Sequence, residues 1–158
     1  MKNKCGYKKK DLQLIKNFIK EINNEIIVKI ASNGNFYCKL PIYKLYLGNK
    51  KMPNYQKEVW EEWYKKQSFY CGEVNYRIIS LLHEVGHFET FDVNEWISRN
   101  NEVNYLEYQF WCGEINGKEL NFAYWDLPNE YKATEWAIKY YQENKEKCDK
   151  LAKVINYK

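Results

Sequence analysis

The chain has 158 residues, of which 45% are hydrophobic and 18% aromatic. That is enough apolar material for one core and too much for a disordered chain, so we expect a single domain over residues 1–158. The net charge of +4 comes mostly from dispersed lysines, whereas specific base recognition favours arginine, and no apolar stretch suits a signal peptide or a membrane span. We therefore expect a cytoplasmic protein that binds neither nucleic acid nor membranes.

The first predicted element is an amphipathic helix over residues 11–23. Its apolar residues recur at steps of three and four positions: Leu12, Ile15, Phe18, Ile19 and Ile22. Asp11 precedes the first of them, where its carboxylate is placed to cap the helix N-terminus.

A small β-sheet is predicted next. The β-branched run 26–30 and the apolar run 36–40 flank the Asn-Gly pair 33–34, a sequence typical of a tight turn, so we expect a hairpin. After Pro41, residues 42–47 alternate apolar side chains with Lys or Tyr. Because Pro and Lys are tolerated at sheet edges, we expect this last segment to be an edge strand.

Helical patterns dominate the rest of the chain, over 55–64, 74–88 and 129–141. Residues 105–125 are ambiguous, since their partial alternation and the Asn-Gly pair 116–117 are compatible with a hairpin, while good helix formers favour helices. We favour two helices there. The predicted fold class is α+β, with an N-terminal helix and a small β-sheet packed on the helix 74–88 and a mostly helical C-terminal part.

One motif in the helix 74–88 indicates chemistry. His83, Glu84 and His87 form an HExxH sequence, which puts both imidazoles on one helical face and a carboxylate beside them. The chance that two randomly placed histidines and a glutamate give this pattern is roughly one in 700, judged from the frequencies of these residues. The alternative is a pair of buried structural histidines, but Gly86 between them costs helix stability and indicates the close approach of another element.

A catalytic zinc site usually has three protein ligands and an open fourth position, and this chain has no third histidine. A carboxylate must therefore complete the set. Our choice is Glu130, because it shares a face of the helix 129–141 with Ala133 and Ala137, whose small side chains would let that helix lie close to the motif. The other acids considered are Glu89, Asp92 and Glu135, which we expect to point elsewhere. The five cysteines form no CxxC pair, which argues against a zinc site built from them.

The segments ISLLHEVGHF (79–88) and LPNEYKATEWAIKYY (127–141) together resemble compact gluzincin metallopeptidases, in particular the ImmA/IrrE-type and small phage-borne HExxH proteins. The resemblance covers roughly residues 76–141 and implies a minimal zincin-like gluzincin fold. It maps the third zinc ligand onto Glu130 and an aromatic-Ala pair onto 136–137. The chain departs from the pattern in a longer gap between His87 and Glu130, and in Thr134, which stands where an acid could orient a zinc ligand.

The residues and the resemblance imply a zinc-dependent peptidase acting on a protein or peptide. Zn²⁺ would polarise the scissile carbonyl and activate a water, and Glu84 would take the proton and deliver it to the leaving amine. One of the tyrosines, Arg77 or Arg99 would stabilise the oxyanion. By analogy alone, the substrate is a regulatory protein of a phage or mobile element. The alternative is a zincin-shaped binding or anti-defence protein that sequesters a partner through exposed Trp and Tyr side chains.

Overall fold

The computed structural model describes residues 6–31, 36–48, 54–69 and 76–155, which form seven helices and a three-stranded mixed sheet. In chain order the elements are α1 (Lys9–Ile22), β1 (Ile27–Ile30), β2 (Tyr37–Lys39), β3 (Lys44–Leu47), α2 (Asn54–Lys66), α3 (Tyr76–Glu89), α4 (Val93–Trp111), α5 (Gly117–Trp125), α6 (Pro128–Glu143) and α7 (Lys145–Ala152). The expected α+β class is confirmed. None of the helices in these ranges is long and apolar enough to cross a membrane.

The sheet has the order β1-β3-β2, with β1 parallel and β2 antiparallel to β3. The predicted hairpin between the first two strands is therefore wrong, because β3 lies between them; the turn at 33–34 falls outside the described residues. The predicted edge position of the last strand is also wrong. Leu45 and Leu47 of β3 are fully buried, which suits a central strand. The Lys and Tyr side chains that alternate with these leucines lie on the half-exposed face of the sheet, so they do not indicate an edge strand.

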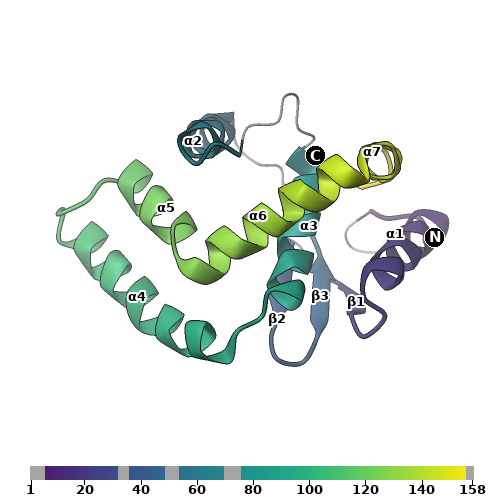
Figure 1. Ribbon diagram of the computed structural model, residues 1–158, viewed down its shortest axis with the longest axis horizontal. Coiled ribbons are helices and arrows are strands. Elements are labelled where there is room, and N and C mark those ends of the chain that lie inside the picture. Colours follow the sequence, from purple (N-terminus) through teal and green to yellow (C-terminus); the bar gives the residue numbers. More distant parts are fainter. Residues whose placement is uncertain (1–5, 32–35, 49–53, 70–75, 156–158) are drawn as a thin grey trace.

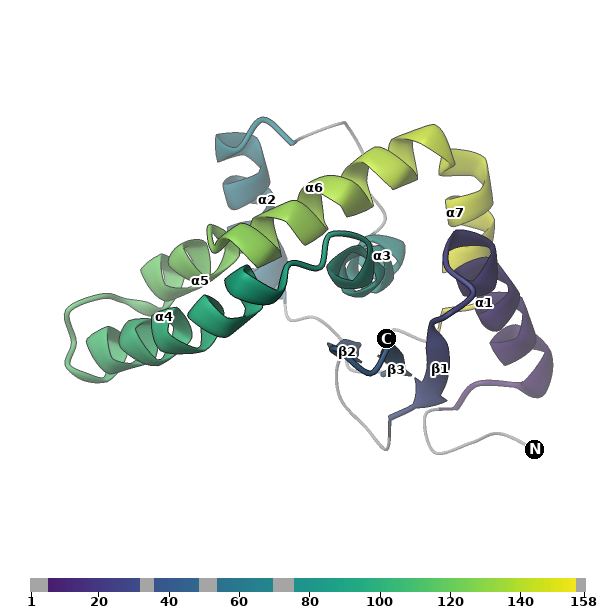
Figure 2. The same ribbon diagram turned by 60° about the horizontal axis from the view of Figure 1, so that its bottom comes forward.

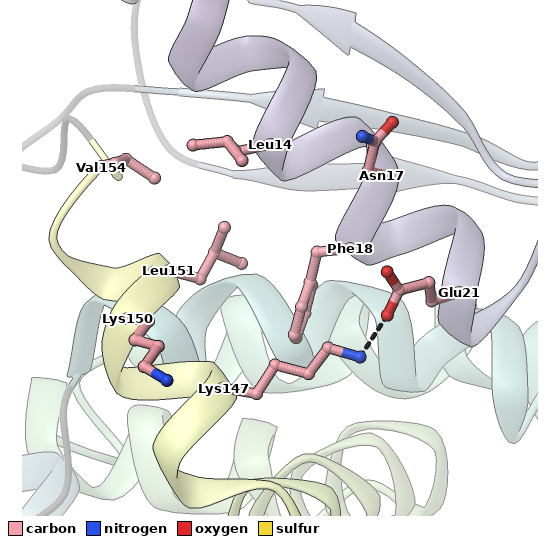
Figure 3. A pocket seen from close by; sticks show the side chains of 8 residues that line it. All are labelled: Leu14, Asn17, Phe18, Glu21, Lys147, Lys150, Leu151 and Val154. Carbon is pink, nitrogen blue, oxygen red and sulfur yellow. Dashed lines mark hydrogen bonds and ion pairs between the residues drawn. The ribbon is translucent and has the colours of Figure 1, made fainter.

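The first helix is confirmed, although it begins at Lys9 and Asp11 does not cap it. It lies beside α7, where Phe18 and Leu151 line a shallow groove and an ion pair joins Glu21 to Lys147 (Figure 3). This contact joins the first helix of the structure to the last.

The ambiguous stretch 105–125 contains the end of α4 and the whole of α5, so the two helices that we favoured are confirmed. The Asn-Gly pair 116–117 does not form a hairpin turn but starts α5. Asn116 accepts hydrogen bonds from the backbone N–H groups of Lys118 and Glu119, and the Glu119 side chain accepts the Asn116 N–H in return. This reciprocal capping box explains why a turn-like sequence begins a helix.

Helix α3 is the centre of the molecule. It lies between the sheet on one side and α6 on the other (Figures 1 and 2). Its fully buried side chains are Ile78, Ile79, Leu81, Leu82 and Val85. A helix enclosed in this way has little freedom to shift, so side chains that it directs toward α6 are held in fixed positions.

Candidate metal centre

The two histidines of the HExxH sequence lie one turn apart on the α6 side of α3. Their ring centroids are 4.6 Å apart. The His83 side chain is 18% exposed and the His87 side chain 7%. His87 is therefore largely shielded from solvent, whereas His83 is partly accessible to it.

Glu130, in the first turn of α6, faces both imidazoles. Its Oε2 atom lies 3.1 Å from His83 Nε2 and 3.3 Å from His87 Nε2, and the side chain is 3% exposed. The structure thus brings together the three residues that the sequence selected as metal ligands. The competing acids lie elsewhere: Glu135 is exposed, Glu89 accepts a hydrogen bond from Asn23, and Asp92 caps α4.

Gly86 allows α6 to approach α3 this closely. A Cβ atom at Gly86 would lie 2.5 Å from the Ala133 carbonyl oxygen and 3.0 Å from the Ala133 Cα. The expected close approach of another element at this glycine is confirmed, as is the role of the small residues Ala133 and Ala137, both fully buried. Without this contact, Glu130 could not reach the histidines, because its carboxylate is carried by the same helix one turn earlier.

The second carboxylate oxygen of Glu130 is occupied by three donors. Oε1 accepts hydrogen bonds from Arg99 Nε at 3.1 Å, from the Tyr124 hydroxyl at 3.0 Å and from Asn129 Nδ2 at 3.2 Å. Arg99 Nη2 also donates to the Tyr124 hydroxyl at 2.6 Å. These bonds fix the carboxylate so that only Oε2 faces the imidazoles, which suits a ligand that uses one oxygen.

Thr134 orients His83 from the other side. Its Oγ1 atom lies 3.0 Å from His83 Nδ1, and Thr134 is buried. A neutral His83 that donates from Nδ1 keeps the lone pair of Nε2 toward Glu130, as metal-binding histidines require. The sequence did not identify Thr134 as the orienting partner, because an acidic residue was expected at that position.

Glu84 lies beside the histidines, and its carboxylate contacts the sheet. Its Oε2 atom accepts the backbone N–H of Cys38, in β2, at 2.9 Å. The carboxylate is half-buried. It is thus held next to the three converging side chains without joining their contacts, which is the position expected of a base.

The charges in this cluster are mutually stabilising. Burial raises the pKa of Glu130, but hydrogen bonds and charge interactions with His83 and His87 outweigh it and hold the pKa well below its ordinary value. Burial lowers the pKa of His83, but the hydrogen bond and charge of Glu130, with the charge of Glu84, outweigh it and raise the pKa. The glutamate is thus an anion at neutral pH, a form that attracts either a proton on the imidazoles or a metal cation.

The donor atoms fit a zinc ion. One nitrogen from each histidine and a Glu130 oxygen lie within 4.8 Å of one another. Two ligands held about 2.0–2.1 Å from a tetrahedral zinc are separated by about 3.3 Å, and the two distances from Glu130 to the imidazoles are 3.1 and 3.3 Å. Nitrogen and carboxylate donors are also the types that zinc accepts.

Comparison of the chain with known protein families, curated proteins and solved structures found no match. The interpretation of the centre therefore depends on the HExxH sequence and on the geometry of the side chains described above.

Proposed function

We propose that this protein is a zinc-dependent peptidase with a zincin-like fold of the gluzincin type. The observation that carries the proposal is the convergence of His83 and His87 from α3 with Glu130 from α6, with atom separations that match the edges of a zinc tetrahedron. The HExxH sequence and its resemblance to ImmA/IrrE-type proteins support the same assignment. The substrate would be a protein or peptide, and the resemblance points to a regulatory protein of a phage or mobile element.

Each residue of the candidate site has a separate role in this proposal. A bound zinc ion supplies Lewis acidity, polarising a carbonyl and lowering the pKa of water to about 7. Glu84 accepts a proton at its carboxylate and passes it to the leaving amine. Thr134 holds His83 in the required tautomer, while Arg99 and Tyr124 orient Glu130. Since Arg99 and Tyr124 are already bonded to this ligand, we assign them to positioning and not to the oxyanion.

The experiment that tests this function separates metal binding from chemistry. Glu84→Gln should keep about one zinc per chain and lose peptidase activity, because the amide preserves the acceptor for the Cys38 N–H but cannot take a proton. Glu135→Gln is the matched control, since Glu135 is exposed, and should keep both properties. Full peptidase activity in Glu84→Gln would contradict the proposal.

A second candidate function is partner binding, and the helix pair α4 and α5, which we call the arm, favours it. The arm extends away from the sheet (Figures 1 and 2), and neither helix has a buried residue. One face of α4 carries exposed apolar side chains: Val93, Ile97, Tyr105, Tyr108 and Trp111. Aromatic side chains of this kind anchor protein interfaces.

The two candidates give opposite results in one comparison. If sequestration is the biological activity, Glu84→Gln retains it and Trp111→Ala, which removes a side chain that is 82% exposed, reduces it. If proteolysis is the activity, Glu84→Gln abolishes it whatever the state of the arm.

A further inference from the structure

The three-stranded sheet turns one face to the core and the other to solvent. Leu45 and Leu47 of β3 lie on the buried face, the side on which α3 packs (Figure 2). The side chains that alternate with them, together with those beside them on the two neighbouring strands, form what we call the outer sheet face: Ile27, Lys29, Tyr37, Lys39, Lys44 and Tyr46. All six are exposed or half-exposed, and none of them belongs to the hydrophobic core.

The strand register arranges these six side chains in two rows. One row is Ile27, Lys44 and Lys39, and the other is Lys29, Tyr46 and Tyr37. The two tyrosine rings are stacked, with centroids 4.5 Å apart and an interplanar angle of 6°. Tyr37 belongs to an edge strand, and in the described part of the chain its ring stacks on Tyr46 alone. Since Tyr37 is also 38% exposed, a further planar group can continue the stack on its other side.

The charge of the outer sheet face is positive and unbalanced. Lysines of α5, α6 and α7 have carboxylate partners, whereas Lys29, Lys39 and Lys44 form no ion pair with any residue that the structure describes. Lys39 Nζ instead lies 5.4 Å from the centroid of the Tyr46 ring. Residues 26–57 contain six lysines and no acidic residue. A surface of this kind attracts a polyanion.

We propose that the outer sheet face binds single-stranded nucleic acid without preference for base sequence. Proteins that bind single strands combine positive charges along the backbone with aromatic rings on which the bases stack. The face holds no arginine, the residue whose planar fork reads base edges most often, so its lysines contact phosphates of any sequence. Strands about 4.8 Å apart make the face about 10 Å wide, which is room for about three nucleotides at about 3.4 Å each.

Other polyanions match only part of this surface. An acidic peptide would pair with the lysines but would leave the Tyr37 ring without a stacking partner. A nucleic-acid duplex keeps its bases in its own stack, where they do not reach an aromatic ring. Binding to an anionic membrane requires apolar side chains that enter the lipid, and Ile27 is the only aliphatic side chain of the six.

The inference goes beyond the proposed function and does not depend on it. The metal centre lies on the α6 side of α3, whereas the outer sheet face is turned away from α3. We had expected no binding of nucleic acid, because the lysines are dispersed along the chain. The register of the sheet brings three of them, one from each strand, to one face beside two stacked tyrosines.

The test measures binding of a fluorescein-labelled oligothymidylate of about 12 nucleotides to the full chain by fluorescence polarisation. We expect a Kd of about 1–100 µM at about 0.15 M salt, the range of non-specific binding. Three phosphate contacts to a single strand predict a slope of log K against log salt of about −2. The affinity should therefore fall about 20-fold between about 50 and 200 mM salt.

Matched variants separate stacking from charge. Tyr37→Ala should lower the affinity about fivefold or more, while Tyr37→Phe, which keeps the ring, should bind as the wild type does. Tyr105→Ala, which removes a 60% exposed tyrosine of the arm, should change nothing. Lys39→Ala should reduce the salt slope by about 0.7, whereas Lys139→Ala, which removes an exposed lysine of α6, should leave it unchanged.

One measurement needs no variant and so does not depend on the folding of one. Photo-crosslinking of a 5-iodouridine oligonucleotide to the wild type should label a peptide that contains Tyr37 or Tyr46, and labelling confined to other peptides overturns the inference. It is also overturned if the wild type binds no oligothymidylate up to about 100 µM. Equal affinity of Tyr37→Ala and the wild type overturns it as well. The same holds if a duplex, a polyglutamate peptide or anionic lipid vesicles compete as well as the unlabelled single strand, because charge alone would then explain the binding.

Discussion

The contact between α3 and α6 and the outer part of the arm are built in opposite ways. At the contact, Gly86 and Ala133 bring two backbones together, and the candidate ligand Glu130 is 3% exposed. On the arm, α4 has no buried residue, and Trp111 is 82% exposed. Close packing thus holds the candidate metal centre in place, whereas the arm leaves large apolar side chains exposed to solvent.

The charge follows the same division. Residues 92–126 contain seven acidic and two basic residues, a net charge of −5, while the whole chain carries +4, so the remainder carries +9. Of the two basic residues in this segment, Arg99 binds Glu130 and Lys118 binds Glu62. The segment is thus acidic overall, and it reaches the candidate metal centre through Arg99 and Tyr124.

The largest effect should come from removing the buried Trp63, and the exposed Trp111 of the arm is the matched comparison. Trp63 is fully buried, contacts Trp125 and Tyr131, and donates from Nε1 to Asp126 at 2.8 Å. Trp63→Ala should lower the free energy of unfolding by about 3–5 kcal/mol. Trp111→Ala should change it by less than about 0.5 kcal/mol. Urea denaturation of both variants checks this, and equal losses would mean that the arm is packed.

Two glycine substitutions, one at the contact of α3 and α6 and one on the arm, should also differ in their effects. Gly86→Ala should lower the free energy of unfolding by about 1–3 kcal/mol, because the new Cβ meets backbone atoms of Ala133 that no side-chain rotation can move. Since α6 also carries Glu130, zinc affinity should fall. In Gly117→Ala the nearest atom, on the Phe110 ring, is 3.9 Å away, so little change is expected. Thermal melts measure the stability and zinc titration the affinity. A Gly86→Ala protein with unchanged zinc affinity would mean that the close contact of α3 and α6 does not position Glu130.

Thr134→Val should weaken zinc binding without disturbing the fold. The isosteric side chain removes the hydroxyl 3.0 Å from His83 Nδ1 and leaves the ring without its orienting partner, which typically costs 10- to 100-fold, or about 1.4–2.7 kcal/mol, in metal affinity. Competition with a chromophoric chelator measures the loss. Thr134→Ser should restore most of the affinity, and a valine variant with wild-type affinity would show that this hydrogen bond does not orient the ligand.

The smallest effect expected is that of changing the pH by one unit. Because the pKa of His83 is raised in the metal-free protein, zinc must displace a proton from it at any pH below that value. Apparent affinity should therefore fall as the pH is lowered, by about tenfold per pH unit for each proton released. Calorimetry in two buffers with different ionisation heats counts the protons. An affinity that stays constant from pH 8 to pH 6 would mean that the histidines bind no metal.

The sequence predicted the helices better than the sheet, for a physical reason. The period of the apolar residues over 11–23, 55–64 and 129–141 extends over several turns and indicates one buried face in each. The strands have only three or four residues, so their pattern carries no information on which strands pair. Nor did the sequence reveal the separate helix α7, which follows directly after the cap of α6 at Asn144.

The candidate site shows a similar limit. His83, Glu84 and His87 follow from a local spacing, and Glu130 from the small residues on its face. Arg99, Tyr124 and Thr134 come from three helices, and they meet at the centre only because α4, α5 and α6 fold around it. Contacts of this kind depend on tertiary packing, and the periodicity of a single sequence does not predict them.

The most direct test of metal binding by His83, His87 and Glu130 is the zinc content of the purified, untagged chain and of two glutamate variants. The wild type and Glu135→Ala should each hold about one zinc per chain, because Glu135 is exposed. Glu130→Ala should lose most of it, since Glu130 supplies the carboxylate oxygen that faces both imidazoles. A wild type that binds no zinc, or a Glu130→Ala protein that keeps a full equivalent, would contradict the account.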